Sequence, residues 1–135
     1  MVRDHCLCLH VQRAARALAR RFDEALRTFD LTNGQFSLLM SLNRPEPPSM
    51  GPVASLLAMD RTTLTAALKP LERRGLVRIS KDPSDQRSRI LQLTEEGRLL
   101  LAHALPVWQG IHNQMEREFP EVSFDALRKN LRAIA

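Results

Sequence analysis

The sequence predicts a mainly α-helical protein with one small β-hairpin, folded as a single domain. Its 135 residues match the usual size of one domain, and a hydrophobic content of 44% is enough to fill a core. Only 4% of the residues are aromatic, so the core must be built from aliphatic side chains, a composition that favours helices over sheets. Apolar residues recur at three- and four-residue steps along most of the chain, and only two short runs are β-prone.

The first helix is predicted over about residues 5–28. Its apolar side chains, which repeat at helical spacing, are Leu7, Val11, Ala14, Ala15, Leu18, Phe22 and Ala25. A second helix begins after Thr32, because Thr32 and Gln35 have the spacing of a capping box, in which each side chain bonds the backbone of the other residue. After the proline-rich loop 44–48, Ser49 is expected to cap a short third helix. The apolar residues predicted to face inward from that helix are Val53, Leu56 and Leu57.

A fourth helix is predicted to begin at Asp60, a residue type that suits the N-cap position. Its apolar stripe, with members at positions i, i+4 and i+7, consists of Leu64, Leu68 and Leu71. The remaining positions are rich in threonine and cationic residues. Pro70 lies within this helix, where it removes one backbone hydrogen bond, so a kink is expected there. Gly75 is expected to end the helix, because glycine readily adopts the left-handed conformation.

Two strands, residues 76–80 and 89–93, are predicted to form a hairpin. The residues between them, 81–88, are polar, basic and rich in turn formers, so they are expected to form a charged tip. A long helix capped by Thr94 follows, with two glutamates placed favourably on its N-terminal dipole. Ser123 is expected to cap a last short helix. The residues predicted to face inward from it are Leu127, Leu131 and Ile134.

The charge of the chain is concentrated in its middle. The 20 lysines and arginines outnumber the 15 acidic residues, for a net charge of +5, which suits a polyanionic partner. Residues 60–90 carry eight basic and four acidic side chains, whereas residues 91–135 carry five and six and are better suited to a protein partner. No run approaches the length of a membrane span, and the N-terminus lacks the apolar core of a signal peptide. A cytoplasmic protein is expected.

The fourth helix and the hairpin together suggest how the chain binds its partner. A short helix, a turn and a second helix with a polar, cationic first half suit the major groove of DNA, which admits one helix whose first turns meet base edges. Threonine hydroxyls donate or accept hydrogen bonds, and their methyl groups contact thymine. An arginine on the hairpin is a second probe, since arginine fits the narrow minor groove. The sequence therefore predicts a winged helix-turn-helix that binds double-stranded DNA.

Five blocks of residues follow one another between residues 31 and 97. They are Leu31-Thr32 with Gln35-Phe36 and Leu38-Leu39, Asp60-Arg61-Thr62-Thr63-Leu64-Thr65, Leu71-Glu72-Arg73-Arg74-Gly75-Leu76-Val77, Asp85-Gln86-Arg87, and Leu93-Thr94 with Gly97. This pattern resembles the MarR family of bacterial transcription regulators. The resemblance implies a homodimer with interlocked N- and C-terminal helices: about residues 31–93 would bind DNA, while residues 5–28 and 95–135 would dimerise. It also implies a regulator, expected to be a repressor, whose subunits each read half of a pseudo-palindromic operator.

The resemblance implies roles for individual residues of the fourth helix and the hairpin. On the helix, Thr62, Thr63 and Thr65 would face base edges, and Arg61 and Lys69 would contact phosphates. On the hairpin, Arg87 would enter the minor groove and Asp85 would brace that arginine. Arg89 is a further candidate for DNA contact. Ala66 departs from the pattern, because many relatives carry an arginine there, so one strong contact is missing and the operator sequence is harder to predict.

Three further readings stay open. The winged helix could serve as a protein-interaction or antirepressor module, an interpretation for which Ala66 leaves room. A small-molecule effector of unknown identity could release the DNA, with Trp108 lining its pocket. Cys6 and Cys8 could form a redox sensor, since some relatives sense peroxides through a cysteine in the first helix. Two observations argue against the redox sensor. The peroxide-sensing relatives use tyrosines around their cysteine, and this chain has no tyrosine. Residues two apart on a helix also point about 200° apart, so at most one of the two cysteines faces a given environment.

Other classes of function find little support in the sequence. The four histidines show no metal-ligand spacing, so neither a metal nor another cofactor is expected. An enzyme is not expected either, because the chain shows no nucleophile–base pair at readable spacing, no glycine-rich phosphate loop and no clustered carboxylates.

Overall fold

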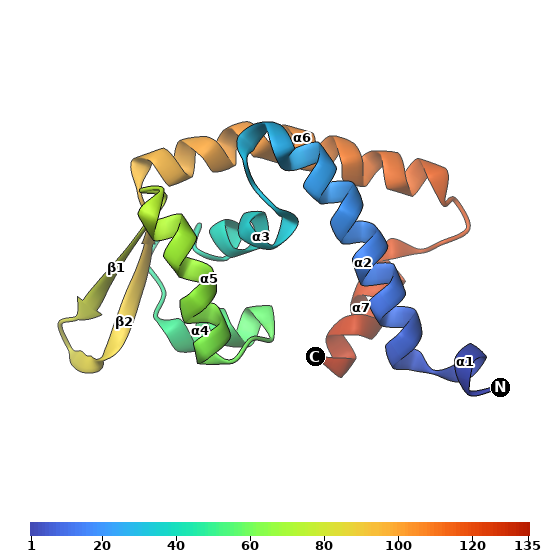
Figure 1. Cartoon of the computed structure of the whole chain (residues 1–135), viewed down its shortest axis with the longest axis horizontal. Helices are drawn as coiled ribbons and strands as arrows, with labels where there is room; N and C mark the ends of the chain where they lie inside the picture. The colour runs from blue at the N-terminus through green and yellow to red at the C-terminus, as the bar shows by residue number, and fades with distance from the viewer.

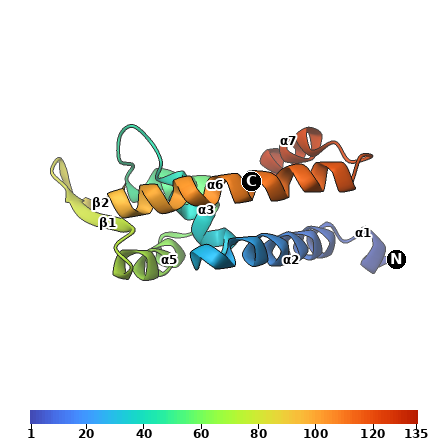
Figure 2. The same ribbon diagram turned by 90° about the horizontal axis from the view of Figure 1, so that it is seen from above.

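The computed structural model covers residues 1–135 and contains seven α-helices, one 3-10 helix and one hairpin. In chain order these are α1 (Val2–His5), α2 (Leu7–Leu26), η1 (Arg27–Phe29), α3 (Asn33–Ser41), α4 (Met50–Leu57), α5 (Arg61–Arg73), β1 (Val77–Asp82), β2 (Asp85–Leu93), α6 (Glu95–Glu118) and α7 (Phe124–Ile134). Helix α6 extends from the hairpin to the far end of the molecule (Figure 1). Figure 2 shows α2 and α7 on opposite sides of α6. The mainly helical fold with a small hairpin, predicted from composition and periodicity, is confirmed.

The first predicted helix is interrupted at its start and shortened at its end. Cys6 has ψ 106°, an extended conformation that separates α1 from α2. The carbonyl of Asp4, which would accept the amide of residue 8 in a continuous helix, is bonded by the ring Nε2 of His10 at 3.1 Å. At the other end α2 tightens into η1, and Asp30 adopts the left-handed conformation with φ 53°. The prediction of one helix over 5–28 was wrong at both ends, because these local side-chain and backbone bonds leave no mark on the apolar periodicity.

Side-chain caps fix where most of the other helices begin. The capping box of α3 is formed, with the Gln35 amide donating to Thr32 Oγ1 at 3.1 Å and the Thr32 amide donating to Gln35 Oε1 at 3.0 Å. Three more predicted caps are formed, by Asp60 for α5, Thr94 for α6 and Ser123 for α7. Ser49 occupies the N-cap position of α4, but its side chain makes no capping bond.

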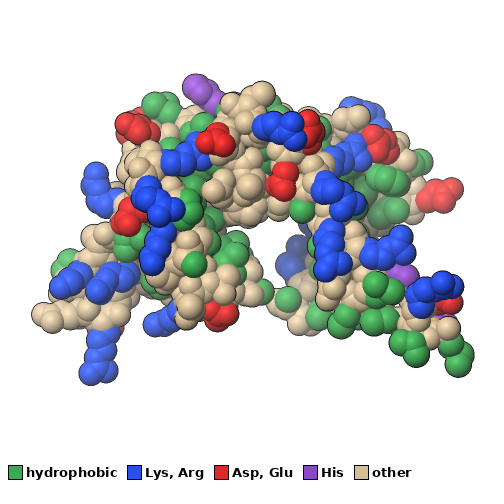
Figure 3. Space-filling model, viewed as in Figure 1, with side chains coloured by type: hydrophobic (Ala, Val, Ile, Leu, Met, Phe, Trp, Pro, Cys, Tyr) green, Lys and Arg blue, Asp and Glu red, His purple; other side chains and the backbone are tan.

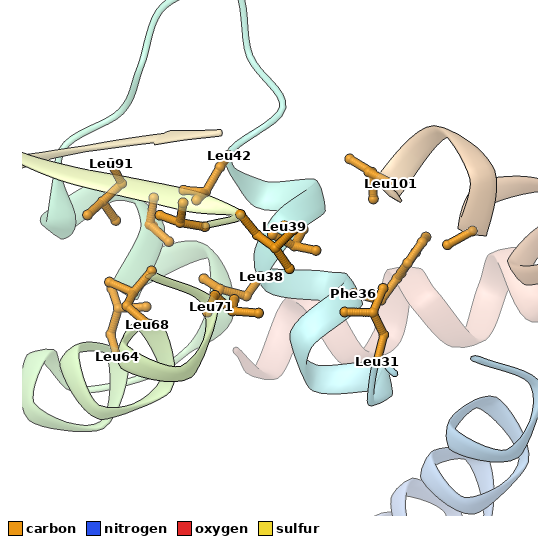
Figure 4. Packing of buried hydrophobic residues seen from close by; sticks show 14 of the residues in the cluster. Leu31, Phe36, Leu38, Leu39, Leu42, Leu64, Leu68, Leu71, Leu91 and Leu101 are labelled. Atoms are coloured by element: carbon orange, nitrogen blue, oxygen red, sulfur yellow. The ribbon is translucent and has the colours of Figure 1, made fainter. Parts of the chain in front are cut away.

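One cluster of sixteen buried apolar residues lies between α3, α4, α5, the hairpin and α6. Leu64, Leu68 and Leu71 of α5 are completely buried, and Figure 4 shows Leu71 beside Leu38 of α3. The stripe predicted for α5 is therefore confirmed. The helix continues through Pro70 to Arg73, and Gly75 follows with φ 73°, as the sequence indicated.

Several leucines that were expected to face inward do not. Leu56 of α4 is 62% exposed. Three apolar residues of α7 are also exposed, with exposed fractions of 43% for Leu127, 41% for Leu131 and 68% for Ile134. Periodicity identifies the apolar face of a helix but does not show what covers that face. The prediction that these four residues face the core of the chain was therefore wrong.

The hairpin is longer and its turn tighter than predicted. Strands β1 and β2 pair antiparallel from Val77 opposite Leu93 to Lys81 opposite Arg89, with an irregularity beside Asp82. The Asp82 carboxylate accepts hydrogen bonds from the amide and the hydroxyl of Ser84, at 2.9 and 2.8 Å, which closes the turn and holds the pKa of that carboxyl below its usual value. Residues 85–88, predicted as part of the charged tip, consequently belong to β2.

An ion pair joins the two long helices. Arg21 of α2 donates two hydrogen bonds to the carboxylate of Glu118 on α6, at 2.8 and 2.7 Å. These bonds lower the pKa of Glu118 and raise that of Arg21. The pair links residues 97 positions apart, so no sequence pattern indicates it. It holds the C-terminal part of α6 against the middle of α2.

Candidate nucleic-acid interface

The first turns of α5 present a threonine-rich surface to solvent. Thr62, Thr63 and Thr65 are all exposed. The Thr63 hydroxyl donates to Asp60 Oδ2 at 3.1 Å, and the Thr65 hydroxyl donates to the Arg61 carbonyl at 2.8 Å. Thr62 has no such partner within the chain, so its hydroxyl remains free to donate. The other two hydroxyls offer acceptor lone pairs and methyl groups, which suit amino groups and thymine methyls in a major groove.

Asp60 organises this turn. Its carboxylate accepts the Thr63 amide at 2.7 Å as well as the Thr63 hydroxyl, and these bonds keep its pKa below the ordinary value. The carboxylate is therefore occupied as the helix cap and faces the positive end of the helix dipole. As a result, the one acidic group at the start of α5 stays ionised, and the positive end of the helix dipole offsets part of its charge.

The wing and α5 converge on one groove. It lies between the first turn of α4, the first turns of α5 and strand β2, and its lining residues are Ser49, Met50, Gly51, Pro52, Arg61, Thr65, Asp85, Arg87, Ser88 and Arg89. Five of the residues predicted from the sequence are therefore brought together there. The other three, Thr62, Thr63 and Lys69, are exposed on α5 outside the groove lining.

The hairpin is anchored so that its strand faces this groove. The Leu91 amide of β2 donates to the Pro48 carbonyl at 2.8 Å, and Ser49 and Ile90 form an isolated bridge. The wing is thus hydrogen-bonded to the segment that begins α4. Sequence reasoning missed this link, because the loop before α4 carries no strand pattern.

Arg87 and Arg89 behave differently on the wing. Arg87 is exposed, and its guanidinium has no hydrogen-bond or ion-pair partner in the chain. It lies within β2, two residues beyond the start of the strand, rather than at the tip where it was predicted. Arg89 is half-buried, and its Nη1 donates to the carbonyls of Gln86 and Ser88 at 3.2 Å each. Of the two, Arg87 is the free cation.

Asp85 acts on the backbone of the wing. Its Oδ1 accepts the amide of Arg87 at 3.0 Å, which fixes the start of β2. The resemblance implied that Asp85 braces the wing arginine, and the bond found here holds the main chain of that arginine rather than its guanidinium. Figure 3 shows that lysine and arginine side chains predominate over the hairpin, so the wing presents a positive surface.

A second hollow, of about 340 Å³, lies between α2, α3 and α6. Its lining residues are Ala15, Leu18, Ala19, Phe22, Asn33, Phe36, Ser37, Trp108 and His112. The rings of Phe36 and Trp108 stack with centroids 5.9 Å apart, and Trp108 and His112 lie 5.1 Å apart. This aromatic pocket is large enough for a small ligand and lies where α3 meets the long helices α2 and α6. Trp108 lines this pocket, as the sequence predicted, and also packs against the core.

The structure also lacks the features of two other kinds of site. No helix is both long and apolar enough to cross a membrane. No group of three or more histidine, cysteine, aspartate or glutamate side chains is arranged to hold a metal ion.

Comparison with known proteins gives one consistent result. The sequence profile of the MarR family matches residues 31–88. The transcriptional regulator HosA of Escherichia coli is 33% identical over 110 residues, which cover 77% of this chain and 80% of HosA. The repressor CouR, solved with a 23-mer DNA duplex, superposes with a TM-score of 0.83 at 32% identity, covering 95% of this chain and 91% of CouR. MosR of M. tuberculosis, solved with DNA, gives 0.84 at 34% identity, covering 96% and 93%. The chain belongs to the MarR family of winged-helix, DNA-binding transcription regulators.

Proposed function

We propose that the protein is a cytoplasmic repressor that binds a pseudo-palindromic operator as a homodimer. The observation that carries this proposal is the groove in which the first turns of α5 meet the unpaired Arg87 of the wing. A helix with exposed threonines fits the major groove, and a free arginine on the adjacent strand fits the flanking minor groove. The DNA-bound relatives place this chain in a family that uses the same fold on DNA.

The residues divide by the contact that each can make. On α5, Thr62, Thr63 and Thr65 face base edges, and Arg61 and Lys69 neutralise phosphates. On the wing, Arg87 enters the minor groove. Asp85 fixes the main chain of the wing, and Arg89 supports the wing from the wall of the groove. Ala66 is exposed beside the threonines and offers only a methyl group. Recognition at that position consequently rests on apolar contact rather than on a bidentate hydrogen bond.

Selection from a library of random 30-bp duplexes tests this function directly. We expect enrichment of an inverted repeat whose halves lie about one helical turn apart, because two copies of α5 must enter successive major grooves. Affinity for the enriched duplex should fall steeply with salt, since lysine and arginine displace counterions from phosphates. Recovery of unenriched sequences, bound no better than competitor DNA, would refute the operator-binding function.

Exposed apolar stripes support the homodimer. On α2, residues Leu7, Val11 and Leu18 are exposed and share one side of the helix. On α7, the corresponding stripe consists of Leu127, Leu131 and Ile134. Both helices lie in the regions 5–28 and 95–135 that the sequence assigned to dimerisation, outside the DNA-reading region 31–93. A second copy of the chain would cover these stripes and remove the exposed apolar surface from water.

Replacing Leu131 with glutamate should convert the dimer to a monomer. A charge buried in the apolar contact of two subunits costs several kcal/mol unless it is paired, about enough to dissociate a moderate dimer. Light scattering after gel filtration measures the mass directly. The matched control is Lys129→Glu, which introduces the same side chain on the opposite side of α7 and should leave the dimer intact. A Leu131→Glu variant that remains dimeric would exclude α7 from the interface.

The aromatic pocket is the proposed effector site. It borders Phe36 of α3 on the DNA-reading side and Trp108 of α6 on the dimer side. A ligand bound there would release the operator only if it binds more tightly to a dimer whose two α5 helices have a different separation from that in the DNA-bound dimer. A planar apolar group would fit between these rings, because stacked aromatic contacts are favourable.

A cysteine-based redox switch is the second candidate function. Cys6 lies outside α2 in an extended conformation, so the two thiols are not held on opposite sides of a continuous helix, as the sequence had suggested. A peroxide would oxidise the two thiols to a disulfide and would itself be reduced to water and an alcohol. Cys6 is half-buried and Cys8 is exposed, so Cys8 is the thiol that a peroxide meets first.

Oxidation should weaken operator binding if this second function is real. We expect peroxide to shift the mass of the chain by the loss of two hydrogens and to lower its affinity for the operator, with both effects reversed by a thiol reductant. The variant Cys6→Ser keeps the fold and removes the disulfide, so its affinity should not respond to reductant. An unchanged affinity of the oxidised wild type would leave the cysteines without a regulatory role.

A further inference from the structure

We propose that Arg74 is a positioning residue for DNA reading: it ties the C-terminal end of α5 to the junction between α2 and α3 and so sets the angle of the reading helix. This inference rests on the proposed function, in which α5 enters the major groove. Arg74 lies at the end of a cationic helix, where an exposed arginine could also contact a DNA phosphate. Its hydrogen bonds assign it to a different task.

The guanidinium of Arg74 spans two backbone carbonyls on another helix. Its Nη1 donates to the Asp30 carbonyl at 2.6 Å, and its Nη2 donates to the Phe29 carbonyl at 3.2 Å. Both carbonyls lie just past the C-terminal end of α2, where η1 ends and unpaired carbonyls accumulate negative partial charge. The planar fork of arginine matches two adjacent acceptors, and the shorter lysine ammonium cannot bond both in the same way.

The receiving end of this contact is itself fixed. The Asp23 carboxylate of α2 accepts the Asn33 amide at 2.6 Å and the Asn33 side chain at 2.9 Å, which ties the start of α3 to the last turns of α2. Leu31 lies between these bonds and is buried in the core. Arg74 therefore holds α5 against a firm junction rather than against a mobile loop.

This arrangement makes Arg74 the link between the aromatic pocket and α5. Asn33 and Phe22 line that pocket, and Phe22 lies on α2 two turns before the carbonyls that Arg74 bonds. A shift of the end of α2 is consequently carried to the C-terminal end of α5 by two charge-assisted hydrogen bonds. Such bonds are stronger than neutral ones, so they favour a single orientation of α5.

Positioning and phosphate contact predict different results for the same substitutions. A phosphate contact depends on charge, so lysine would replace arginine with little loss of affinity. A neutral residue would weaken specific and non-specific binding alike. It would also reduce the slope of the logarithm of affinity against the logarithm of salt concentration by about 0.9. A positioning bond depends on the arginine fork. Its loss would leave non-specific binding nearly unchanged and would reduce the preference for the operator, because base contacts depend on the orientation of α5.

The experiment compares Arg74→Lys and Arg74→Gln with Arg73→Gln in the full-length protein. Arg73 is the matched control, since it is the adjacent residue, is exposed and makes no hydrogen bond or ion pair in the chain. Dissociation constants are measured for the selected operator and for an unrelated duplex of equal length, across a salt series. We expect both Arg74 variants to lower the operator preference by about tenfold, the loss of a charge-assisted contact, with the salt slope of Arg74→Lys unchanged.

Arg73→Gln should keep the operator preference of the wild type. A wild-type preference in Arg74→Lys would overturn the positioning role, and so would an Arg74→Gln variant that loses the same factor on both duplexes. If Arg74→Gln does not fold, Arg74→Lys alone decides the question, because that variant keeps the charge and loses only the fork. A wild type without operator preference would instead refute the proposed function itself, and the positioning role with it.

Discussion

Replacing both Arg61 and Arg87 with alanine is expected to weaken operator binding by about 2–4 kcal/mol, or about 30- to 1000-fold. Both side chains line the groove between α5 and the wing, and Arg87 has no partner within the chain. Removing Arg61 should weaken binding to all sequences and reduce the salt slope by about one phosphate contact. Removing Arg87 should also weaken discrimination in the minor groove.

The control for this double variant removes the same charge elsewhere. Arg13 and Arg20 are exposed on α2 and make no ion pair or hydrogen bond in the chain, so replacing both with alanine lowers the net charge equally. Fluorescence anisotropy with a labelled operator measures both variants at one salt concentration. Equal losses in the two double variants would mean that total charge, rather than the groove, determines binding.

Replacing Gly97 with alanine is expected to lower the free energy of unfolding by about 3 kcal/mol, near the upper end for overpacking a buried site. A Cβ at this position would lie against the carbonyl oxygen of Leu76 and only 3.0 Å from its carbonyl carbon. Both groups are backbone, so neither can move without displacing the start of β1 or of α6. Denaturant unfolding at a fixed protein concentration measures the change, since dimerisation would also contribute to stability.

Gly110 provides the matched control in the same helix. No atom lies within 4 Å of a Cβ built there, so Gly110→Ala meets open space. Alanine restricts the unfolded chain and favours the helix, and we expect this variant to gain about 0.5–1 kcal/mol. If Gly97→Ala unfolded at the same denaturant concentration as the wild type, the close approach of α6 to Leu76 would not exist in solution.

The start of most helices could be read from the sequence because a cap is a local interaction. Thr32, Asp60, Thr94 and Ser123 each bond an amide three residues ahead, so residue type and spacing are sufficient evidence. The break at Cys6 could not be read in this way. It depends on the ring of His10 reaching the Asp4 carbonyl, six residues away, and the apolar periodicity continues through it.

Contacts between distant segments account for the remaining differences. Strand β2 extends back to Asp85 because a tight turn at Asp82 and Ser84 pairs Asp85 with Asp82, while residues 86–88 fall in the irregularity between that pair and the pair of Lys81 and Arg89. The glycine at position 97 was visible as part of a motif, but its purpose became evident only from the adjacent carbonyl of Leu76. The leucines on α7 are exposed although their spacing predicted burial, because periodicity does not show what covers a helix face.

The sequence could name candidate residues for the interface but could not predict their geometry. Residue type and the family resemblance identified the threonines of α5 and Arg87 of the wing. Only the structure shows that the Thr63 and Thr65 hydroxyls bond within the first turns of α5 and that Arg89 bonds its own strand. These bonds leave Thr62 and Arg87 as the least committed polar groups of the site.

Hydroxyl-radical footprinting on the selected operator tests the central claim most directly, namely that two copies of α5 and the wing read one pseudo-palindrome. We expect two equivalent protected segments related by the dyad of the operator, with centres about one helical turn apart, together with flanking minor-groove protection that disappears in the Arg87→Ala variant. A single protected segment, or protection spread evenly along the duplex, would contradict the claim.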